Sequence, residues 1–482
     1  MTRFAERLLA SGMSEAEASR KARLLQRASD QLGPAPAGVG EPFAVFVPGR
    51  IEVLGKHTDY AGGRSLLCAA ERGICLVARP RGDGAVCVTD IVSNTRADVT
   101  VDRDPVPPRE ASRGAAARSG GDWALYIATV ARRVARNFAG ALRGADIAFG
   151  SDLPMAAGMS SSSALITSML LALSAVNDLP ATGAWRANIT SREDLAEYLG
   201  TIENGQDFRA LGGDAGVGTF GGSEDHTAML CCRAGELSQY SFCPVRHERQ
   251  IPMPAGYVFA IAVSGVVAEK TGAARDTYNR ASLAARRVLE LWNRTTGRHD
   301  PTLRGAVESS ADAADRIRAI LAKSVVKSDR DEFQFPPPQA GKNCDRSGTG
   351  FVDSTGEGLR ARFDQFVEET FVIIPEVGDH LAAGRVGEIS DLVDRSQAGA
   401  ERGLANQVPE TSFLARSARE LGAVAASAFG AGFGGSVWAL VGAPQAGEFC
   451  ARWSARYVAA FPQHAGRAQF FATAAGPAAL EW

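Results

Sequence analysis

Residues 48 to 63 constrain the fold and the function of this chain more than any other stretch. They read PGRIEVLGKHTDYAGG and follow a β-branched and aromatic run, 43 to 47, that predicts a strand. A dense set of polar side chains then alternates with glycines: Arg50, Glu52, Lys56, His57, Asp59 and Tyr60. Such density in a loop leaving a strand suits a hydroxyl-rich ligand, because donors and acceptors must converge on a small polar molecule. A charged surface loop is the alternative that composition leaves open.

A second motif, LPMAAGMSSSSAL at 153–165, opens into an apolar helix expected over 164–176. The first N–H groups of a helix have no internal partners and carry the positive end of its dipole. A collar of glycine and serine therefore lets a phosphate approach them closely. A serine hydroxyl can add a ligand for Mg²⁺. A serine-rich N-cap is the structural alternative.

Two glycine runs, 216–221 and 428–436, each resemble the dinucleotide pattern GxGxxG. The pattern requires the order strand, loop, helix, and a helix precedes both runs here, so we reject a dinucleotide site. The run at 428–436 enters a strand expected over 437–441, where glycines allow close approach of another backbone segment or a ligand.

Acidic residues gather on two expected helices between these motifs. The helix expected over 192–208 carries Glu203, and a helix after Ser223 carries Glu224 and Asp225 in its first turn. A solvated helix face and a favourable first-turn charge are the structural explanations.

Composition limits the class of protein. A chain of 482 residues can bury a large core and predicts two domains. A net charge of −2 without a basic block argues against nucleic acid as a partner. Signal-peptide and membrane-spanning patterns are missing, so we predict no membrane partner. Eight scattered cysteines without a CxxC pair predict free thiols in a reducing cytoplasm.

The first motif resembles the galactokinase signature GRVNLIGEHTDYNGG, in the GHMP family of small-molecule kinases. It keeps the Arg, His, Thr, Asp, Tyr and final glycines, but Glu52 replaces Asn and Lys56 replaces Glu. The second motif resembles PxGxGLSSSA, with Ala156 in place of the first Gly, and the third matches GAGFGG unchanged. In the galactokinase pattern the helix at Asp225 begins GIMDQ. The resemblance covers residues 42 to 475.

This resemblance implies an α/β (α+β) fold of two domains, one ribosomal-protein-like and one ferredoxin-like. We expect a leading helix at 1–40, an N-terminal domain at 41–250, and a C-terminal domain at 251–482 with an insertion near 324–358. We also expect a cytoplasmic monomer or weak homodimer that binds ATP, Mg²⁺ and a sugar between the domains.

The implied reaction moves the γ-phosphate of ATP to the anomeric hydroxyl of a galactose-like monosaccharide, an alcohol-group phosphotransfer of galactose metabolism. The implied catalytic residues are Asp225 and Arg50. Sugar contacts would come from Glu52, Lys56, His57, Asp59 and Tyr278. ATP would be held by Pro154, Ala156, Ala157, Gly158, Met159, Ser160, Ser161, Ser162 and Ser163, beside the third-motif residues Gly430, Gly432, Gly434 and Gly435. Ser162, in a register that could shift by one, and Glu203 would hold Mg²⁺.

Three alternatives stay open at this point. Lys56 could bind the carboxylate of a uronic acid such as galacturonate, because a charge-assisted bond would discriminate against a neutral sugar. Glu52 and Lys56 could instead form an internal pair that leaves the pocket neutral. The chain could also be a sugar- and ATP-binding regulator without turnover. The HTDY run at 57–60 argues against mevalonate or homoserine as substrate.

Overall fold

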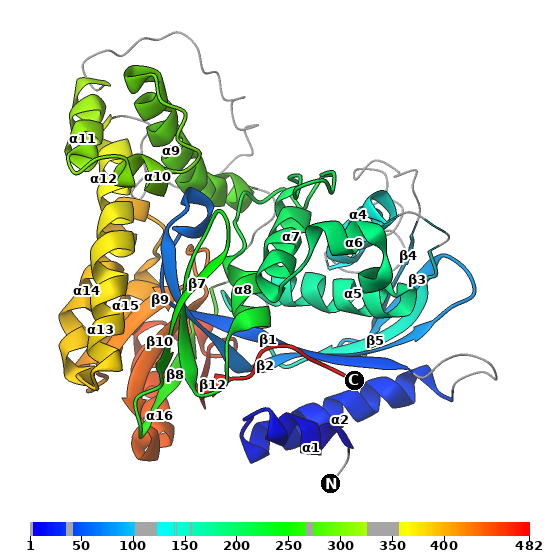
Figure 1. The fold of residues 1–482 in the computed structure, drawn as a ribbon. Coiled ribbons are helices and arrows are strands. Elements are labelled where there is room, and N and C mark those ends of the chain that lie inside the picture. Colours follow the sequence, from blue (N-terminus) through cyan, green and yellow to red (C-terminus); the bar gives the residue numbers. More distant parts are fainter. Residues whose placement is uncertain are drawn as a thin grey trace.

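Two β-sheets and the helices around them form the computed structural model (Figure 1). It describes residues 3–34, 42–101, 123–138, 140, 142–154, 157–266, 273–324 and 356–482, without the side chains of 273–278 and 324. The larger sheet runs in the order β13-β1-β2-β5-β3-β4, and β12, β6 and β7 extend it beside β2. Its strands are β1 (Phe43–Leu54), β2 (Arg64–Pro80), β3 (Ala85–Asp90), β4 (Thr95–Thr100), β5 (Ala145–Ser151), β6 (Glu236–Ser241), β7 (Arg246–Pro252), β12 (Ala475–Gly476) and β13 (Leu480–Glu481).

Helices cover both faces of the larger sheet, which explains why β1 and β2 are buried along almost their whole length. Phe46 points to α1 (Arg3–Ala10) and α2 (Glu15–Leu32), whereas its neighbours Val45 and Val47 point to α4 (Ala124–Asn137) and α5 (Ser161–Asn177). Figure 1 shows the two layers on opposite sides of the sheet. The predicted leading helix is thus two helices.

More of the first motif lies on strand β1 than the sequence predicted. The strand predicted over 43–47 continues to Leu54, so Arg50 and Glu52 are strand residues, and the loop expected there is wrong for both. The pairing of β1 with β2 shifts its register between Pro48 and Arg50. Gly73, opposite Pro48, has no room for a side chain, because a Cβ would lie 2.3 Å from the Val47 carbonyl oxygen. Its partner β2 is likewise one long, mostly buried strand.

The smaller sheet is antiparallel, in the order β11-β8-β10-β9. Its strands are β8 (Tyr257–Val263), β9 (Ala425–Phe429), β10 (Ser436–Gly442) and β11 (Gln469–Thr473). One face packs on α15 (Pro409–Glu420) and α16 (Ala446–Ala460) through Leu414 and Trp453. The other face belongs to the core of the larger sheet, and there the indole nitrogen of Trp438 donates to the carbonyl of Val53 (3.2 Å).

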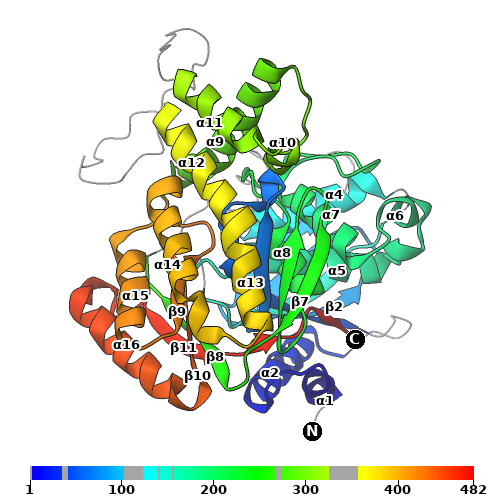
Figure 2. The same cartoon turned by 60° about the vertical axis from the view of Figure 1, so that its left-hand side comes forward.

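A helical layer lies over the end of β1 and carries its own core. It contains α9 (Ala273–Thr296), α10 (Leu303–Glu308), α11 (Ala313–Ser324) and α12 (Gly356–Glu368). Figure 2 shows α12 continuing into α13 (Ile374–Ala382), through the π-helical turn Glu369–Ile373. The excursion near 324–358 falls almost entirely outside the described residues.

The remaining described helices are α6 (Gly183–Asn188), α7 (Arg192–Asn204), α8 (Glu224–Cys231) and α14 (Ser390–Gly399). Sequence reasoning placed α7 and α8 correctly within a few residues. The predicted domain boundaries stay a prediction, and we note that β12 and β13 pair with β2 and β1, far from them in sequence. Within the described ranges, no helix combines the length and apolar character needed to cross a bilayer.

Trp438 joins the two sheets, so Trp438→Ala is expected to lower the free energy of unfolding by about 3–5 kcal/mol, from lost burial and a cavity. Val92→Ala, at an exposed apolar side chain, is the control and should change it by less than about 0.5 kcal/mol. Urea unfolding measures both. Equal effects would mean that the two sheets do not depend on this contact.

Candidate active site

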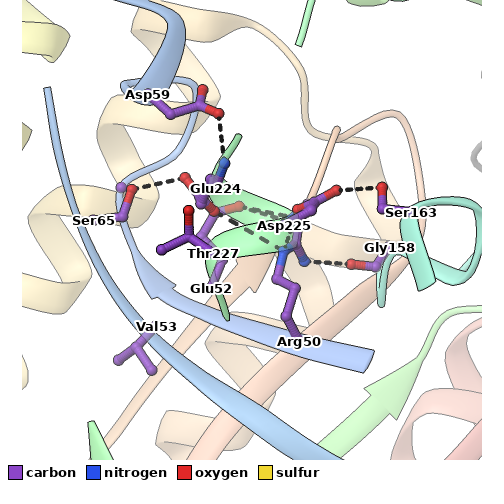
Figure 3. A network of polar contacts seen from close by, with 12 residues as sticks. Arg50, Glu52, Val53, Asp59, Ser65, Gly158, Ser163, Glu224, Asp225 and Thr227 are labelled. Carbon is purple, nitrogen blue, oxygen red and sulfur yellow. Dashed lines mark hydrogen bonds and ion pairs between the residues drawn. The ribbon is translucent and has the colours of Figure 1, made fainter. Parts of the chain in front are cut away.

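Arg50 connects three segments that are far apart in the sequence (Figure 3). It is 4% exposed on β1, and its Nε donates to Asp225 Oδ1 at the start of α8 (2.7 Å). Its Nη1 donates to the carbonyl oxygen of Gly158 in the serine-rich turn (2.6 Å). The first motif, the predicted phosphate turn and the predicted catalytic carboxylate therefore meet at one guanidinium.

Ser163 connects the two carboxylates that the sequence singled out. Its Oγ lies 2.9 Å from Glu203 Oε2 and 3.2 Å from Asp225 Oδ2, so its single proton can serve either. The predicted metal pair was Ser162 and Glu203. The structure brings the next serine to Glu203 instead, because the serines already form the first turn of α5 and successive helical side chains point about 100° apart.

His226 is a residue of this site that sequence reasoning missed. It is fully buried, with Nδ1 3.1 Å from Thr167 Oγ1 and Nε2 3.3 Å from Glu203 Oε2. Its position after Asp225 was the available signal, since both residues start the same helix. The contact holds the side chain of Glu203 between α5 and α8.

The third motif packs against the phosphate turn, as the resemblance implies. A Cβ on Gly430 would lie 2.7 Å from the Gly158 carbonyl oxygen, and Ser436 Oγ donates to the carbonyl of Ala157 (2.5 Å). Gly158 and Ser160 both have positive φ (75° and 57°), which turns the chain into α5. Gly435 approaches Ala157, whereas Gly432 and Gly434 approach Asn406 and Val266. Of the predicted ATP residues, Ala156 lies outside the described chain.

Predicted sugar residues gather in a polar pocket at this junction. The pocket is lined by Arg50, Glu52, His57, Asp59, Tyr60, Glu203, Gly221, Gly222, Glu224, Asp225, Gly430 and Ala431. Sequence reasoning missed Glu224 as a pocket residue, because it has the ordinary role of a first-turn acid. The side chain of Tyr278 lies outside the described residues.

His57 and Asp59 are fixed by neighbouring groups. The His57 ring nitrogens lie 3.1 Å from Tyr60 Oη and 3.2 Å from the Ala431 carbonyl oxygen. Asp59 Oδ2 accepts from the backbone N–H of Glu224 (3.2 Å). Arg362, a buried residue that the sequence did not single out, donates to the carbonyl of His57 (2.6 Å). These contacts leave the His57 and Asp59 side chains on the pocket wall in a set orientation.

Burial dominates the electrostatics of the acidic side chains. It raises the pKa of Glu52 from its ordinary 4.5 to about 7, although Arg50 and Lys56 oppose the shift. Burial also raises the pKa of Asp59, and it raises that of Glu224 well above the ordinary range. The carboxyl groups compete for one guanidinium, because Arg50 lies within 4.0 Å of Glu52, Glu224 and Asp225 alike.

Lys56 neither faces the pocket, as a uronate contact would, nor forms an ion pair with Glu52. Its side chain is 1% exposed and is absent from the pocket lining, and Nζ donates to Ser427 Oγ (2.8 Å) and Ser396 Oγ (3.0 Å). The ion pairs of the described residues do not include Glu52 with Lys56; the lysine lowers the pKa of Glu52 only through space. The structure thus corrects Lys56 from a sugar contact to a buried cation under β9 and α14.

The sequence of this chain is similar to known protein families and to individual known proteins. Residues 37–80 match the galactokinase galactose-binding signature, residues 125–222 the GHMP kinases N terminal domain, and residues 379–459 the GHMP kinases C terminal domain. Galactokinase from Roseiflexus sp. is 25% identical over 410 residues, 84% of each chain. Galactokinase from Glaesserella parasuis is 29% identical over 233 residues, which is 48% of this chain and 52% of that protein, so the match spans about half the length of that relative.

The fold is also found among solved structures. Lactococcus lactis galactokinase complexed with galactose superposes with a TM-score of 0.69 at 18% identity, over 95% of this chain and 99% of that one. Methanococcus jannaschii mevalonate kinase covers 91% of this chain and 99% of its own, with a TM-score of 0.50 and 11% identity. Both share the mixed α/β fold. The chain thus carries the galactokinase galactose-binding signature and both GHMP kinase domains, and over most of its length it is similar to a protein named galactokinase.

Because Lys56 is buried, Lys56→Glu is expected to lower the free energy of unfolding by about 3 kcal/mol or more: it replaces a cation by a carboxylate near Glu52. Lys56→Met should cost less, because it removes the charge without adding a buried anion. Urea unfolding compares them, with Lys323→Glu, at an exposed position of α11, as control. A fully tolerated Lys56→Glu that gains galactose turnover would contradict this placement.

Glu52→Gln is expected to stabilise the protein more at pH 8 than at pH 5, by on the order of 1–3 kcal/mol. Between pH 4.5 and about 7 the folded state binds more protons at Glu52 than the unfolded state, so this residue lowers stability as pH rises. Gln cannot ionise and removes that contribution. Urea unfolding at both pH values is the measurement. The control Glu15→Gln, on the exposed side of α2, should stay within about 0.5 kcal/mol; a pH-independent effect of Glu52→Gln would refute the shifted pKa.

Proposed function

We propose that this protein transfers the γ-phosphate of ATP to the anomeric hydroxyl of a galactose-like monosaccharide, giving a sugar 1-phosphate and ADP. The observation that carries the proposal is the pair of bonds from Arg50 to Asp225 and to the Gly158 carbonyl. These bonds hold a carboxylate able to receive a hydroxyl proton beside a turn suited to phosphate. Phosphoryl transfer depends mainly on such positioning and on charge neutralisation.

The start of α5 suits the phosphates of ATP. Its first backbone N–H groups, from Ser161 onward, lack intrahelical partners and carry the positive end of the dipole. Gly158 is packed against Phe429 and Gly430, so close that a Cβ would lie 2.9 Å from the Phe429 carbonyl oxygen. The packing of the third motif therefore fixes the backbone of the phosphate turn.

The donor set beside this turn fits Mg²⁺. Ser163 Oγ lies within 3.2 Å of a carboxylate oxygen of Glu203 and of Asp225, and Mg²⁺ is commonly held by one or two carboxylates together with phosphate oxygens. Mg²⁺ bound there would neutralise charge on the transferring phosphate. Ser162 remains a candidate by the resemblance alone.

Asp225 would accept the proton of the anomeric hydroxyl or orient that hydroxyl for attack. Arg50 keeps the carboxylate aimed into the pocket and offsets the negative charge that develops. His57 and Asp59 on the pocket wall would hold sugar hydroxyls, because both present hydrogen-bonding atoms there.

The structure weakens the galacturonate alternative. Lys56, the cation on which it depended, faces Ser396 and Ser427, and the pocket is lined by carboxylates that would repel a uronate. A regulator without turnover is disfavoured by the assembled Arg50, Asp225 and Ser163. ADP release with ATP, Mg²⁺ and a sugar separates an enzyme from a regulator.

Asp225→Ala is expected to reduce kcat by at least about 100-fold, the usual contribution of a positioned acid–base group. Thermal unfolding should confirm that the variant folds, and ADP release measures the loss. Asp83→Ala, whose carboxylate pairs with Arg81 on the surface, is the control and should keep the wild-type rate. An Asp225→Ala enzyme with a tenth of the wild-type kcat would remove Asp225 from the chemistry.

A further inference from the structure

The pocket holds more carboxyl groups than its own cations could balance if all of them were ionised. Five carboxylates line it: Glu52, Asp59, Glu203, Glu224 and Asp225. Among the described residues of the lining, Arg50 is the one lysine or arginine. Its Nε and Nη1 are already bonded to Asp225 and Gly158, and its Nη2 lies only at 3.5 Å from Glu52.

Two of these acids distinguish this chain from the galactokinase pattern. Glu52 stands where that pattern has Asn, and Glu224 stands where GIMDQ has Met. Lys56, which replaces an acid, is directed away from the pocket. The pocket has therefore gained two carboxyl groups without gaining a cation that faces them.

Glu52 has an oxygen that the protein leaves unused. The side chain is 3% exposed; Oε2 accepts from the backbone N–H of Gly430 (3.2 Å), whereas Oε1 has no hydrogen-bond partner among the described residues. Glu224 is 5% exposed, and its Oε2 accepts from Ser65 Oγ (2.7 Å), while its Oε1 has Arg50 Nε at 4.0 Å. A buried carboxylate is costly unless a proton or a cation compensates it.

We propose that the sugar substrate carries a protonated amino group next to the anomeric carbon, bound by Glu52 and Glu224. The proposal rests on the sugar kinase function proposed above and names its substrate class, a 2-amino-2-deoxyhexose. Both glutamates surround Arg50, whose partner Asp225 faces the anomeric hydroxyl in that function. We place the amino group on the carbon next to the anomeric one because both glutamates lie beside the arginine that holds Asp225.

The chemistry of the pocket favours an ammonium group over other ligands. An ammonium offers three donors and suits separate carboxyl groups, such as those of Glu52 and Glu224 in the pocket lining. A second metal ion would need converging ligands, and the described residues contain no group of three or more His, Cys, Asp or Glu side chains placed to hold one. An N-acetyl group has the same position but no charge, so it gives a matched comparison.

The test uses the full chain with ATP and Mg²⁺ at pH 7 and three sugars: galactosamine, N-acetylgalactosamine and galactose. ADP release gives kcat/KM, and the sugar-induced rise in melting temperature, measured without ATP, reports binding separately from turnover. We expect kcat/KM for galactosamine to exceed that for galactose at least about tenfold, as a charge-assisted bond would give.

Glu52→Gln and Glu224→Gln keep the shape of each side chain and remove its charge. Each should lower the galactosamine-to-galactose ratio of kcat/KM about 10- to 100-fold. Glu71→Gln is the matched control: Glu71 is also buried (5% exposed) but accepts from the backbone N–H groups of Ser14 and Ala474, so the ratio should not change. If one pocket variant does not fold, the other still reports the ratio.

The outcomes separate the two proposals. Turnover of galactose equal to or above that of galactosamine would overturn the ammonium site and leave the kinase function standing. A melting shift with galactosamine alone, without ADP release from any sugar, would support the ammonium site and overturn the kinase function. Neither a shift nor turnover with galactosamine would overturn the ammonium site, and a ratio unchanged by both pocket variants would do the same.

Discussion

The buried guanidinium of Arg50 is the interaction on which the site depends. A residue on β1 reaches a carbonyl in the turn before α5 and a carboxylate at the start of α8, so three elements of the larger sheet and its helical layer share one charge. The charge is tolerable in the interior because several carboxyl groups surround it. These carboxyl groups outnumber the single positive charge of Arg50. The pocket therefore attracts cations and protons.

Lys56 and Glu369 show how charge has been rearranged without disturbing the fold. The lysine amine contacts Ser396, whose hydroxyl donates to Glu369 Oε1 (3.0 Å), and the same oxygen accepts from the backbone N–H of Gly55 (2.8 Å). The buried Lys56 is thus linked to the acid Glu369 through the hydroxyl of Ser396, between the end of the first motif and α14. The substitution that looked like a change of substrate contact in the sequence acts on packing between the two sheets.

The sequence predicted much of the fold, because local patterns carry that information, and several residues that it singled out lie together at one pocket. The strand predicted over 437–441 follows from an apolar run after glycines, and α8 follows from a capping serine and first-turn acids. It could not predict that Arg50 and Glu52 lie within β1, since this depends on Gly73 yielding room across the sheet. Nor could it orient Lys56, choose Ser163 over Ser162, or find Arg362, because each depends on contacts between residues tens to hundreds of positions apart.

The pairing of β13 with β1 has a consequence for how the molecule folds. Val45 lies opposite Glu481, so neighbouring strands of the sheet that carries Arg50 come from positions more than 400 residues apart. Closing so large a loop lowers the entropy of the chain before the new contacts stabilise it. Folding rates fall as contacts become less local in sequence. We therefore expect β13 to pair with the edge of β1 late in folding, after the helices that cover the faces of the sheet have docked.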